Sequence, residues 1–262
     1  MPTYLGEILA THRAQAGEDH RVLAELVERA KATPAPRDFA GALRGQGLAC
    51  IAEIKRRSPS KGDLDPALRP EDVAVEYLDG GAACLSVLTD ADYFGGDPAD
   101  LVAARAASGL PVLRKDFTVS EADVADARTM GADAVLLIVA ALDDGELRRF
   151  SALADALSLT ALVEVHDEAE LERALRAEAR VIGVNQRDLK TFSVDHERAA
   201  SLAKRIPSDL VAVAESGIRD GADAARLAEA GYDAILVGET LVRASDRSSE
   251  LRSLIGHAVT AR

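Results

Sequence analysis

The sequence predicts an α/β protein built as a closed (β/α)8 barrel, the TIM-barrel architecture, with extra N-terminal helices. After residue 48, short apolar runs alternate with amphipathic segments rich in Ala, Glu, Arg and Leu, and the apolar runs begin about every 26 residues. Such alternation is typical of βα units that form a parallel sheet. Eight units within about 215 residues fit a closed barrel, whose usual size is about 250 residues.

The apolar runs are short and rich in Val, Ile and Leu, as expected for strands buried on both faces. An open doubly wound sheet is the alternative. Against it, none of these runs is followed by a G-x-G-x-x-G turn, and the alternation shows no break halfway. The predicted strands are 50–55, 84–89, 112–117, 134–140, 160–165, 181–185, 210–216 and 234–239.

The first 48 residues precede the barrel pattern. They contain TYLGEILATHRAQ and HRVLAELVERAKA, whose periodicity predicts one or two helices before the first strand. We find no linker or low-complexity stretch that would mark a second domain. We therefore predict a single domain over residues 1–262, with 1–48 as an N-terminal helical extension.

Composition excludes several classes of function. The net charge of −13 and the pI of about 4.9 argue against nucleic-acid and anionic-membrane partners. No apolar run approaches the ~18 residues of a membrane span, and the charged N-terminus does not resemble a signal peptide. We expect a cytoplasmic monomer whose two cysteines, Cys50 and Cys84, are reduced and buried. The five histidines lack metal-ligand spacing, so we expect no metal site.

The most informative feature is the charge at the carboxyl ends of the predicted strands, where barrels of this kind place their active sites. Glu53 and Lys55 lie two residues apart, so they share one face of the first strand. Buried charges are costly unless they are paired, so their repetition on other strands indicates a site for proton transfer. The same alternation turns inward Lys115 and Phe117, Glu164, Asn185 with Arg187 just beyond, and Glu215 followed by Ser216.

A phosphate site is predicted beside these charges. Gly217 follows the seventh strand and Gly238 lies at the end of the eighth, where glycine lets a backbone approach a ligand closely. The loops after strands seven and eight are the usual phosphate site of this fold. The expected ligand is therefore a small phosphorylated molecule.

Two further features leave alternatives open. Tyr93 and Phe94 follow the second strand in the loop DADYFGGD, where they either cover a planar ligand or anchor the loop to the barrel. His166 shares the face of Glu164, and on this evidence it is either part of the site or a residue of its rim.

With these residues assembled, the chain resembles the indole-3-glycerol phosphate synthase family along essentially its whole length. The resemblance is carried, in the family's order and spacing, by IAEIKRRSPSKG, LSVLTDADYFGG, PVLRKDF, LVEVHD, IGVNQRDLKTF, AESGI and VGETL. It implies a carbon–carbon lyase (a carboxy-lyase) of tryptophan biosynthesis that needs no cofactor. The implied reaction is ring closure, decarboxylation and dehydration of 1-(2-carboxyphenylamino)-1-deoxyribulose 5-phosphate to indole-3-glycerol phosphate.

The resemblance also implies roles for the catalytic residues. Lys115 is the expected general acid. We expect burial to lower its pKa, so that this compact cation can donate a proton. Glu164 is expected to transfer the proton of the dehydration step. Lys55 is expected to contact the substrate, and Glu53 is expected to hold and tune Lys55. Asn185, Glu215 and Ser216 complete the catalytic set. Which lysine delivers the first proton stays open.

The implied substrate contacts follow the same blocks. Arg187 grips the anthranilate carboxylate. The remaining contacts are Phe94 and Leu189 around the aromatic ring and Ser58, Gly217 and Gly238 around the phosphate. Phe117 and Glu239 are further expected substrate contacts, and residues 58–62 form a loop over the substrate. Two positions depart from the family's pattern: Gln186, expected to matter little, and Glu239, whose carboxylate would repel a phosphate unless it turned outward.

Two other readings compete with this one. A phosphoribosylanthranilate isomerase would share the phosphate loops but would be expected to use a Cys/Asp pair, and Cys50 lies at the wrong end of the first strand. A catalytically silent phosphometabolite-binding barrel would leave Lys55, Lys115 and Glu164 without a use. The role of residues 1–48, as a lid on the site or a cap on the barrel, also stays open.

Overall fold

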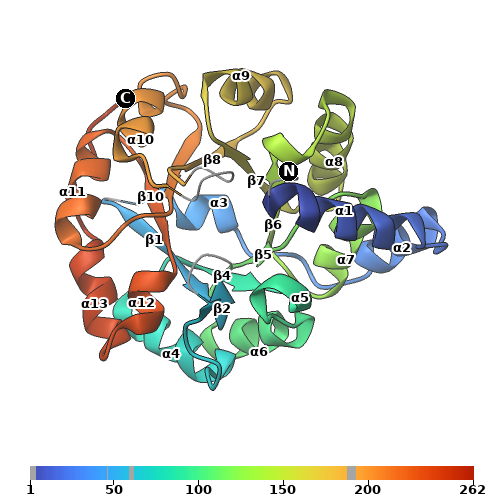
Figure 1. Ribbon diagram of the computed structural model, residues 1–262, viewed down its shortest axis with the longest axis horizontal. Helices are drawn as coiled ribbons and strands as arrows, with labels where there is room; N and C mark the ends of the chain where they lie inside the picture. The colour runs from blue at the N-terminus through green and yellow to red at the C-terminus, as the bar shows by residue number, and fades with distance from the viewer. Residues whose placement is uncertain (1–3, 46, 59–61, 188–192) are drawn as a thin grey trace.

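A closed, eight-stranded parallel barrel forms the centre of the molecule, and helices form a ring around it (Figure 1). The computed structural model describes residues 4–45, 47–58, 62–187 and 193–262. The sheet closes because β1 pairs with both β4 and β10, and each pairing is parallel. In order along the chain, the barrel strands are β1 (Ala49–Ile54), β4 (Cys84–Leu88), β5 (Val112–Lys115), β6 (Ala134–Ile138), β7 (Thr160–Val165), β8 (Val181–Asn185), β9 (Val211–Glu215) and β10 (Ala234–Val237).

The predicted barrel is confirmed, with corrections at the ends of strands. Strands β5, β6 and β10 end two residues earlier than predicted, so Phe117 lies beyond β5 and Lys115 is the last residue of that strand. Lys55 similarly follows the end of β1. The physical reason is that hydrogen-bonded pairing stops where the βα loops begin, whereas the apolar pattern continues into them.

The outer helices begin and end at residues suited to those positions. Aspartate caps several of them; Asp143, for example, forms a capping box with Glu146. Gly81 and Gly109 end α4 and α6 in the left-handed conformation. The ring comprises α4 (Pro70–Gly80), α6 (Pro98–Ser108), α7 (Glu121–Thr129), α8 (Asp144–Ala156), α9 (Glu168–Arg176), α10 (His196–Ala203), α11 (Gly221–Glu229) and α13 (Arg247–Leu254).

Several short elements that the sequence did not predict lie in the loops at the mouth of the barrel. The loop after β4 contains α5 (Ala91–Phe94), because Asp90 accepts hydrogen bonds from Tyr93 N and Phe94 N. A two-stranded hairpin follows β1, and residues 59–61 of the predicted loop over the substrate lie outside the described residues. The remaining short elements are β2 (Arg57–Ser58), β3 (Gly62–Asp63), η1 (Val139–Ala141) and α12 (Glu239–Arg243).

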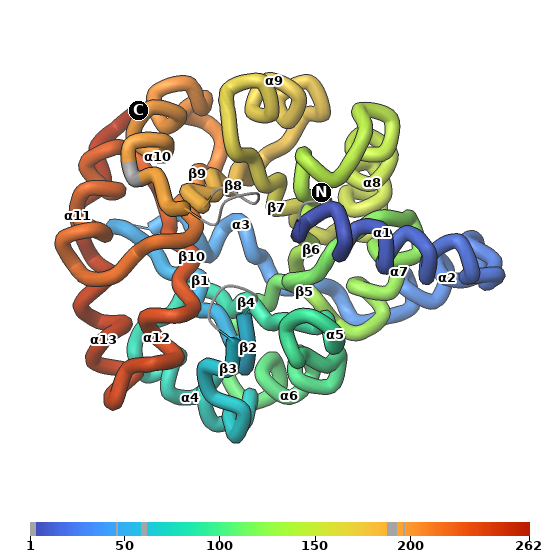
Figure 2. Tube along the Cα trace, viewed as in Figure 1, coloured from blue at the N-terminus to red at the C-terminus, as the bar shows by residue number. Residues whose placement is uncertain are grey.

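The N-terminal extension contributes at both ends of the barrel. It forms three helices, α1 (Tyr4–Gly17), α2 (Leu23–Lys31) and α3 (Phe39–Ala42), rather than one or two. Helix α3 buries Phe39 and Leu43 in the barrel interior with Cys84, the first residue of β4, and so closes the end opposite the mouth. Helix α2 packs beside α7, while α1 crosses toward the barrel opening (Figure 2).

The core has two layers, as strand alternation predicts. Inward residues such as Ile51, Leu113, Leu162 and Val213 fill the barrel interior. Outward residues of the same strands, including Cys50, pack against the helices in the second layer. None of the helices within the described residues is long and apolar enough to cross a membrane.

A buried aspartate ties the extension to the barrel. Asp133, directly before β6, accepts hydrogen bonds from Val112 N at 2.8 Å and from Arg37 N at 2.7 Å. The Arg105 guanidinium completes its shell at 2.9 Å. One carboxylate thus connects a strand, an outer helix and the segment between α2 and α3.

We therefore predict that Asp133→Ala lowers the free energy of unfolding by about 3 kcal/mol, because it leaves an arginine and two backbone amides without their partner. Urea denaturation measures this change. The control is Asp155→Ala, which removes the exposed ion pair with Arg180 and should cost below about 1 kcal/mol. Equal losses in the two variants would contradict the role of Asp133.

Candidate active site

A cavity of about 670 Å³ lies at the carboxyl ends of the strands, a size suited to a small ligand. It brings together the predicted site residues that the structure describes, whereas Leu189 lies outside the described residues. Their roles stay predictions. The predicted residues that line the cavity are Glu53, Lys55, Ser58, Phe94, Lys115, Phe117, Glu164, Asn185, Arg187, Glu215, Ser216, Gly217, Gly238 and Glu239.

Glu53 and Lys55 form an ion pair at the end of β1, with Lys55 Nζ 2.5 Å from Glu53 Oε1. Burial raises the pKa of Glu53, but the positive charges of Lys55 and Lys115 outweigh burial and leave that pKa below its usual value. Gly238 makes room for this pair, since a Cβ there would lie 2.4 Å from Glu53 Oε1. The glycine after β10 therefore serves the charges as well as the predicted phosphate loop.

Lys115 occupies the centre of the charged group. Its Nζ lies 3.9 Å from Glu164 Oε2 and 3.9 Å from Glu215 Oε2. Burial lowers the pKa of Lys115, but the negative charges of Glu164, Glu53 and Glu215 raise it, and the net direction is upward. The expectation of a lowered pKa is therefore wrong: the carboxyl groups reverse the effect of burial, and Lys115 is held as the ammonium ion.

Glu215 is the carboxyl group that resists ionisation. Burial and the negative charge of Glu164 raise its pKa well above the usual value, against the lowering effect of Lys115. Its Oε1 fills the space beside Gly183 on β8, where a Cβ would lie 2.0 Å away. The site thus holds two ammonium groups among three carboxyl groups, one of which favours its neutral form.

Glu164 is oriented from the neighbouring strand. Its Oε1 accepts a hydrogen bond from Asn185 Nδ2 at 3.1 Å, and Asn185 Oδ1 in turn accepts from Arg187 N at 3.0 Å. His166 Nε2 lies 3.4 Å from the same Glu164 oxygen. The shared face of Glu164 and His166 is thereby confirmed.

The loops after β9 and β10 form one side of the cavity. Ser216 and Gly217 both have positive φ, +68° and +73°, and Gln186 Nε2 donates to Ser216 O at 2.8 Å. Thr240 Oγ1 donates to Ile218 O at 2.6 Å and joins the two loops. Gln186, expected to matter little because it points away from Asn185, thus supports a strained turn of the site.

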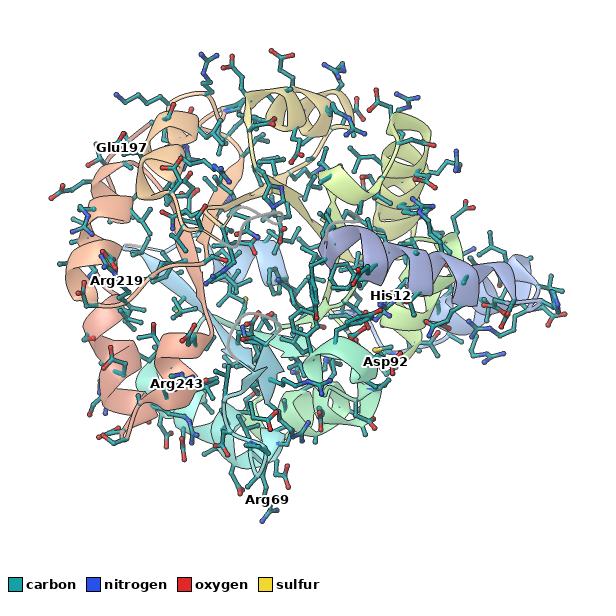
Figure 3. The ribbon with its side chains drawn as sticks, in the orientation of Figure 1. His12, Arg69, Asp92, Glu197, Arg219 and Arg243 are labelled. Carbon is teal, nitrogen blue, oxygen red and sulfur yellow. The ribbon has the colours of Figure 1, made fainter. Side chains whose placement is uncertain are left out.

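Sequence reasoning missed two arginines on this side, Arg219 and Arg243, which line the cavity and are labelled in Figure 3. Glu239 also faces the cavity, and its Oε1 lies 3.5 Å from Arg243 Nε. The sequence suggested that the Glu239 carboxylate would have to turn outward to avoid repelling a phosphate. Instead, the carboxylate lines the cavity, and the positive charge of Arg243 offsets its negative charge. The i,i+4 spacing of Glu239 and Arg243 was the available signal.

The opposite side of the cavity is aromatic and apolar. The rings of Phe94 and Phe117 have centroids 6.2 Å apart. Tyr93 turns away and bonds Thr11 Oγ1 through its hydroxyl at 2.8 Å. Tyr93 therefore anchors the loop, whereas Phe94 lines the cavity, and its contact with a planar ligand stays a prediction.

Helix α1 covers this aromatic side. Tyr4, Leu5 and Ile8 line the cavity, a role that their sequence distance from the barrel concealed. His12 lies between α1 and α5 in Figure 3, with Nε2 2.9 Å from Asp90 Oδ2. Its ring centroid lies 5.3 Å from that of Phe117. The extension thus both covers the mouth and closes the far end of the barrel.

A cation could in principle meet His12, Asp90 and Asp116, which place one ligand atom each within 4.8 Å of one another. These atoms already have protein partners. His12 bonds Asp90, and Asp116 Oδ2 accepts from Thr89 Oγ1 at 2.5 Å and from Arg114 Nη2 at 3.0 Å. The arrangement satisfies its own charges, and we assign no ion to it.

Comparison with solved structures agrees with the fold. The chain is similar to 3-hexulose-6-phosphate synthase from Salmonella typhimurium, with a TM-score of 0.63 and 13% identity over 79% of this chain and 96% of that one. It is also similar to thiamine phosphate pyrophosphorylase from Pyrococcus furiosus, with a TM-score of 0.60 and 16% identity over 83% and 96%. At these identities the likeness concerns architecture alone.

Comparison with sequences is far more specific. The chain is 50% identical to indole-3-glycerol phosphate synthase 2 of Streptomyces coelicolor over 98% of its length and 100% of that protein's. It is 47% identical to indole-3-glycerol phosphate synthase of Aromatoleum aromaticum over 98% and 100%. The model of the family described as indole-3-glycerol phosphate synthase matches residues 5–254. This protein, with its charged and aromatic cavity, belongs to the indole-3-glycerol phosphate synthase family.

Proposed function

We propose that this cavity closes the indole ring of 1-(2-carboxyphenylamino)-1-deoxyribulose 5-phosphate, with release of CO₂ and water, by general acid–base catalysis. One observation carries the proposal: two ammonium groups and three carboxyl groups are gathered between an aromatic side and a glycine-loop side of one cavity. The substrate has a matching order of groups, namely an anthranilate ring, a reacting carbonyl and a phosphate.

The aromatic side suits the anthranilate ring, which Phe94 and Phe117 would contact face or edge. Arg187 would bind the carboxylate through its fork of donors. At the other side, Gly217 and Gly238 would allow close approach of the phosphate, and Ser58 would donate a hydrogen bond. Ser58 Oγ is buried and has no hydrogen-bond partner within the described residues, so it is available to a ligand.

Lys115 lies between these two ends and is the group we assign as general acid. It would protonate the carbonyl oxygen as the ring carbon attacks. Its raised pKa keeps it charged before substrate arrives, and the negative carboxyl groups that raise the pKa also hold the ammonium in place. We assign Lys55 to substrate contact, with Glu53 as its partner.

Glu164 is our base for the dehydration step, in which a proton leaves the carbon next to nitrogen and the hydroxyl group departs as water. Asn185 fixes its orientation through the 3.1 Å hydrogen bond. Glu215 and Ser216 complete this side of the site. No step requires a redox or electrophilic cofactor. The substrate nitrogen donates its lone pair as the ring carbon attacks, and the iminium so formed accepts the electron pair that departing CO₂ leaves behind.

The competing readings fit the site less well. A Cys/Asp pair of the isomerase kind would need a cysteine at the mouth, but Cys50 is buried between barrel and helices and Cys84 lies at the closed end. A binding protein would need the phosphate loops but not the buried Lys115–Glu164–Glu215 group. A cytoplasmic location and a monomeric state stay part of this proposal. The free, buried cysteines support the cytoplasmic location.

We predict that Lys115→Met lowers kcat at least ~10²-fold, the smallest contribution usual for a positioned acid, and changes KM less. Indole fluorescence after addition of the substrate to purified protein measures both constants. Lys204→Met, at an exposed position after α10, is the matched control and should leave them unchanged. Retained kcat in Lys115→Met would refute the acid assignment, and calorimetric binding without fluorescence in the wild-type protein would indicate a silent binder.

We predict a different pattern for the contact between α1 and α5. His12→Ala removes the ion pair with Asp90 and so loosens α1 over the ring pocket; KM should rise about 10-fold, the loss of one charged hydrogen bond, while kcat stays within about threefold. Burial lowers the pKa of His12, but its hydrogen bond to Asp90 and the charge of Asp116 outweigh burial and raise it. The wild-type KM should therefore rise as pH increases through this raised pKa.

The matched control for that variant is His20→Ala, an exposed histidine of the same extension. It should leave KM unchanged. An equal KM in His12→Ala and wild-type protein across the pH range would contradict the role of the His12–Asp90 pair in holding α1 over the ring pocket.

A further inference from the structure

His166 has a fixed position behind Glu164 that the acid–base roles above do not use. It directly follows β7, and its Nδ1 lies 3.0 Å from Glu170 Oε2, which also accepts a hydrogen bond from His166 N at 2.8 Å. Glu170 is held in turn at the start of α9, where its N–H bonds Asp167. The imidazole ring is thus oriented by two contacts to one carboxylate.

The other ring nitrogen is aimed at the site. His166 Nε2 is buried and has no hydrogen-bond partner in the part of the chain that the structure describes. It lies 3.4 Å from Glu164 Oε1. The opposite oxygen, Glu164 Oε2, lies 3.9 Å from Lys115 Nζ. One carboxyl group therefore stands between His166 and the proposed general acid.

The reaction needs a route of this kind because it consumes a proton. Lys115 gives one proton to the carbonyl oxygen. In dehydration, one proton leaves carbon and one joins the departing hydroxyl group, so that step balances. The carboxylate leaves as neutral CO₂, and each turnover therefore takes one proton from solvent, which must reach the Lys115 amine before the next cycle.

We propose that His166, oriented by Glu170, is a positioning residue that returns this proton to Lys115 through Glu164. The imidazolium gives its Nε2 proton to the Glu164 carboxylate at Oε1, 3.4 Å away. The neutral carboxyl group then rotates, and the protonated oxygen passes that proton to the Lys115 amine, which becomes ammonium again and leaves Glu164 a carboxylate. The neutral imidazole regains a proton from solvent between turnovers. The inference rests on the proposed function.

The surroundings of the ring suit this task. The His166 and Glu170 side chains are 12% and 18% exposed, so the pair lies between the buried site and solvent. Burial lowers the pKa of His166, but the Glu170 hydrogen bond and the charge of Glu164 raise it more, against the opposing charge of Arg198. The ring therefore carries its extra proton at a pH where an ordinary histidine begins to lose it.

The test compares the first turnover with later ones in His166→Gln. The first uses the proton already on Lys115 and should proceed within about threefold of the wild-type rate. Later turnovers should slow about 100-fold, the lower end of the usual contribution of a proton-transfer group, so that indole fluorescence shows a burst followed by a slow phase. Added imidazole should bring the rate of the later turnovers back toward the wild-type rate. KM should change less than about twofold.

A slow first turnover would overturn the proposal and leave His166 a structural role. Later turnovers that stay slow after imidazole is added would do the same. Absence of any indole fluorescence from the wild-type and variant proteins alike would instead refute the proposed function. Glu170→Gln provides a second variant should His166→Gln fold poorly; it should move the alkaline fall of the wild-type kcat to lower pH. His257→Gln, whose Nε2 is also buried and whose backbone carbonyl bonds Leu48 N before β1, is the matched control.

Discussion

The need to balance buried charge governs this site. Lys115 and Lys55 share the end of the barrel with Glu53, Glu164 and Glu215, and each would be costly to bury alone. Together they offset one another: the carboxyl groups hold Lys115 as an ammonium ion, while burial and the negative charge of Glu164 raise the pKa of Glu215. A substrate with an anionic carboxylate and phosphate enters a site whose cations are already committed, so its charges must redistribute those of the protein. We infer that proton movement here is a property of the group rather than of one residue.

The barrel provides the geometry that this balance demands. Parallel strands bring side chains far apart in sequence to one end, and glycine makes the close approaches possible. Gly183 gives room to Glu215, and Gly238 gives room to the Glu53–Lys55 pair. Backbone pairing around the closed sheet fixes these positions. Reaction chemistry at the mouth thus depends on packing throughout the wall.

Much of this arrangement could be predicted from the sequence, since a period of two along a strand states which side chains point inward. That rule placed the charged residues correctly at the mouth. It could not place Tyr4 or Ile8, because the path of α1 over the barrel depends on tertiary contacts such as His12 with Asp90. Nor could it give the direction in which the pKa of Lys115 shifts, because that shift depends on the distances to three carboxyl groups on other strands. Local pattern predicts the fold and the members of the site, whereas their mutual electrostatics require coordinates.

The state of Glu215 tests the balance of charge most directly. Infrared difference spectroscopy between wild-type protein and Glu215→Gln, recorded without substrate across a pH series, would detect the carbonyl stretch of a protonated carboxyl group. Burial and the charge of Glu164 raise the pKa of Glu215, so its proton should persist to a higher pH than the proton of an ordinary glutamate. We predict a protonated-carboxyl band that the variant lacks and that disappears from the wild-type spectrum only above the pH at which an ordinary glutamate ionises. A band that disappears at the pH of an ordinary glutamate, or the absence of any such band, would contradict this balance of charge.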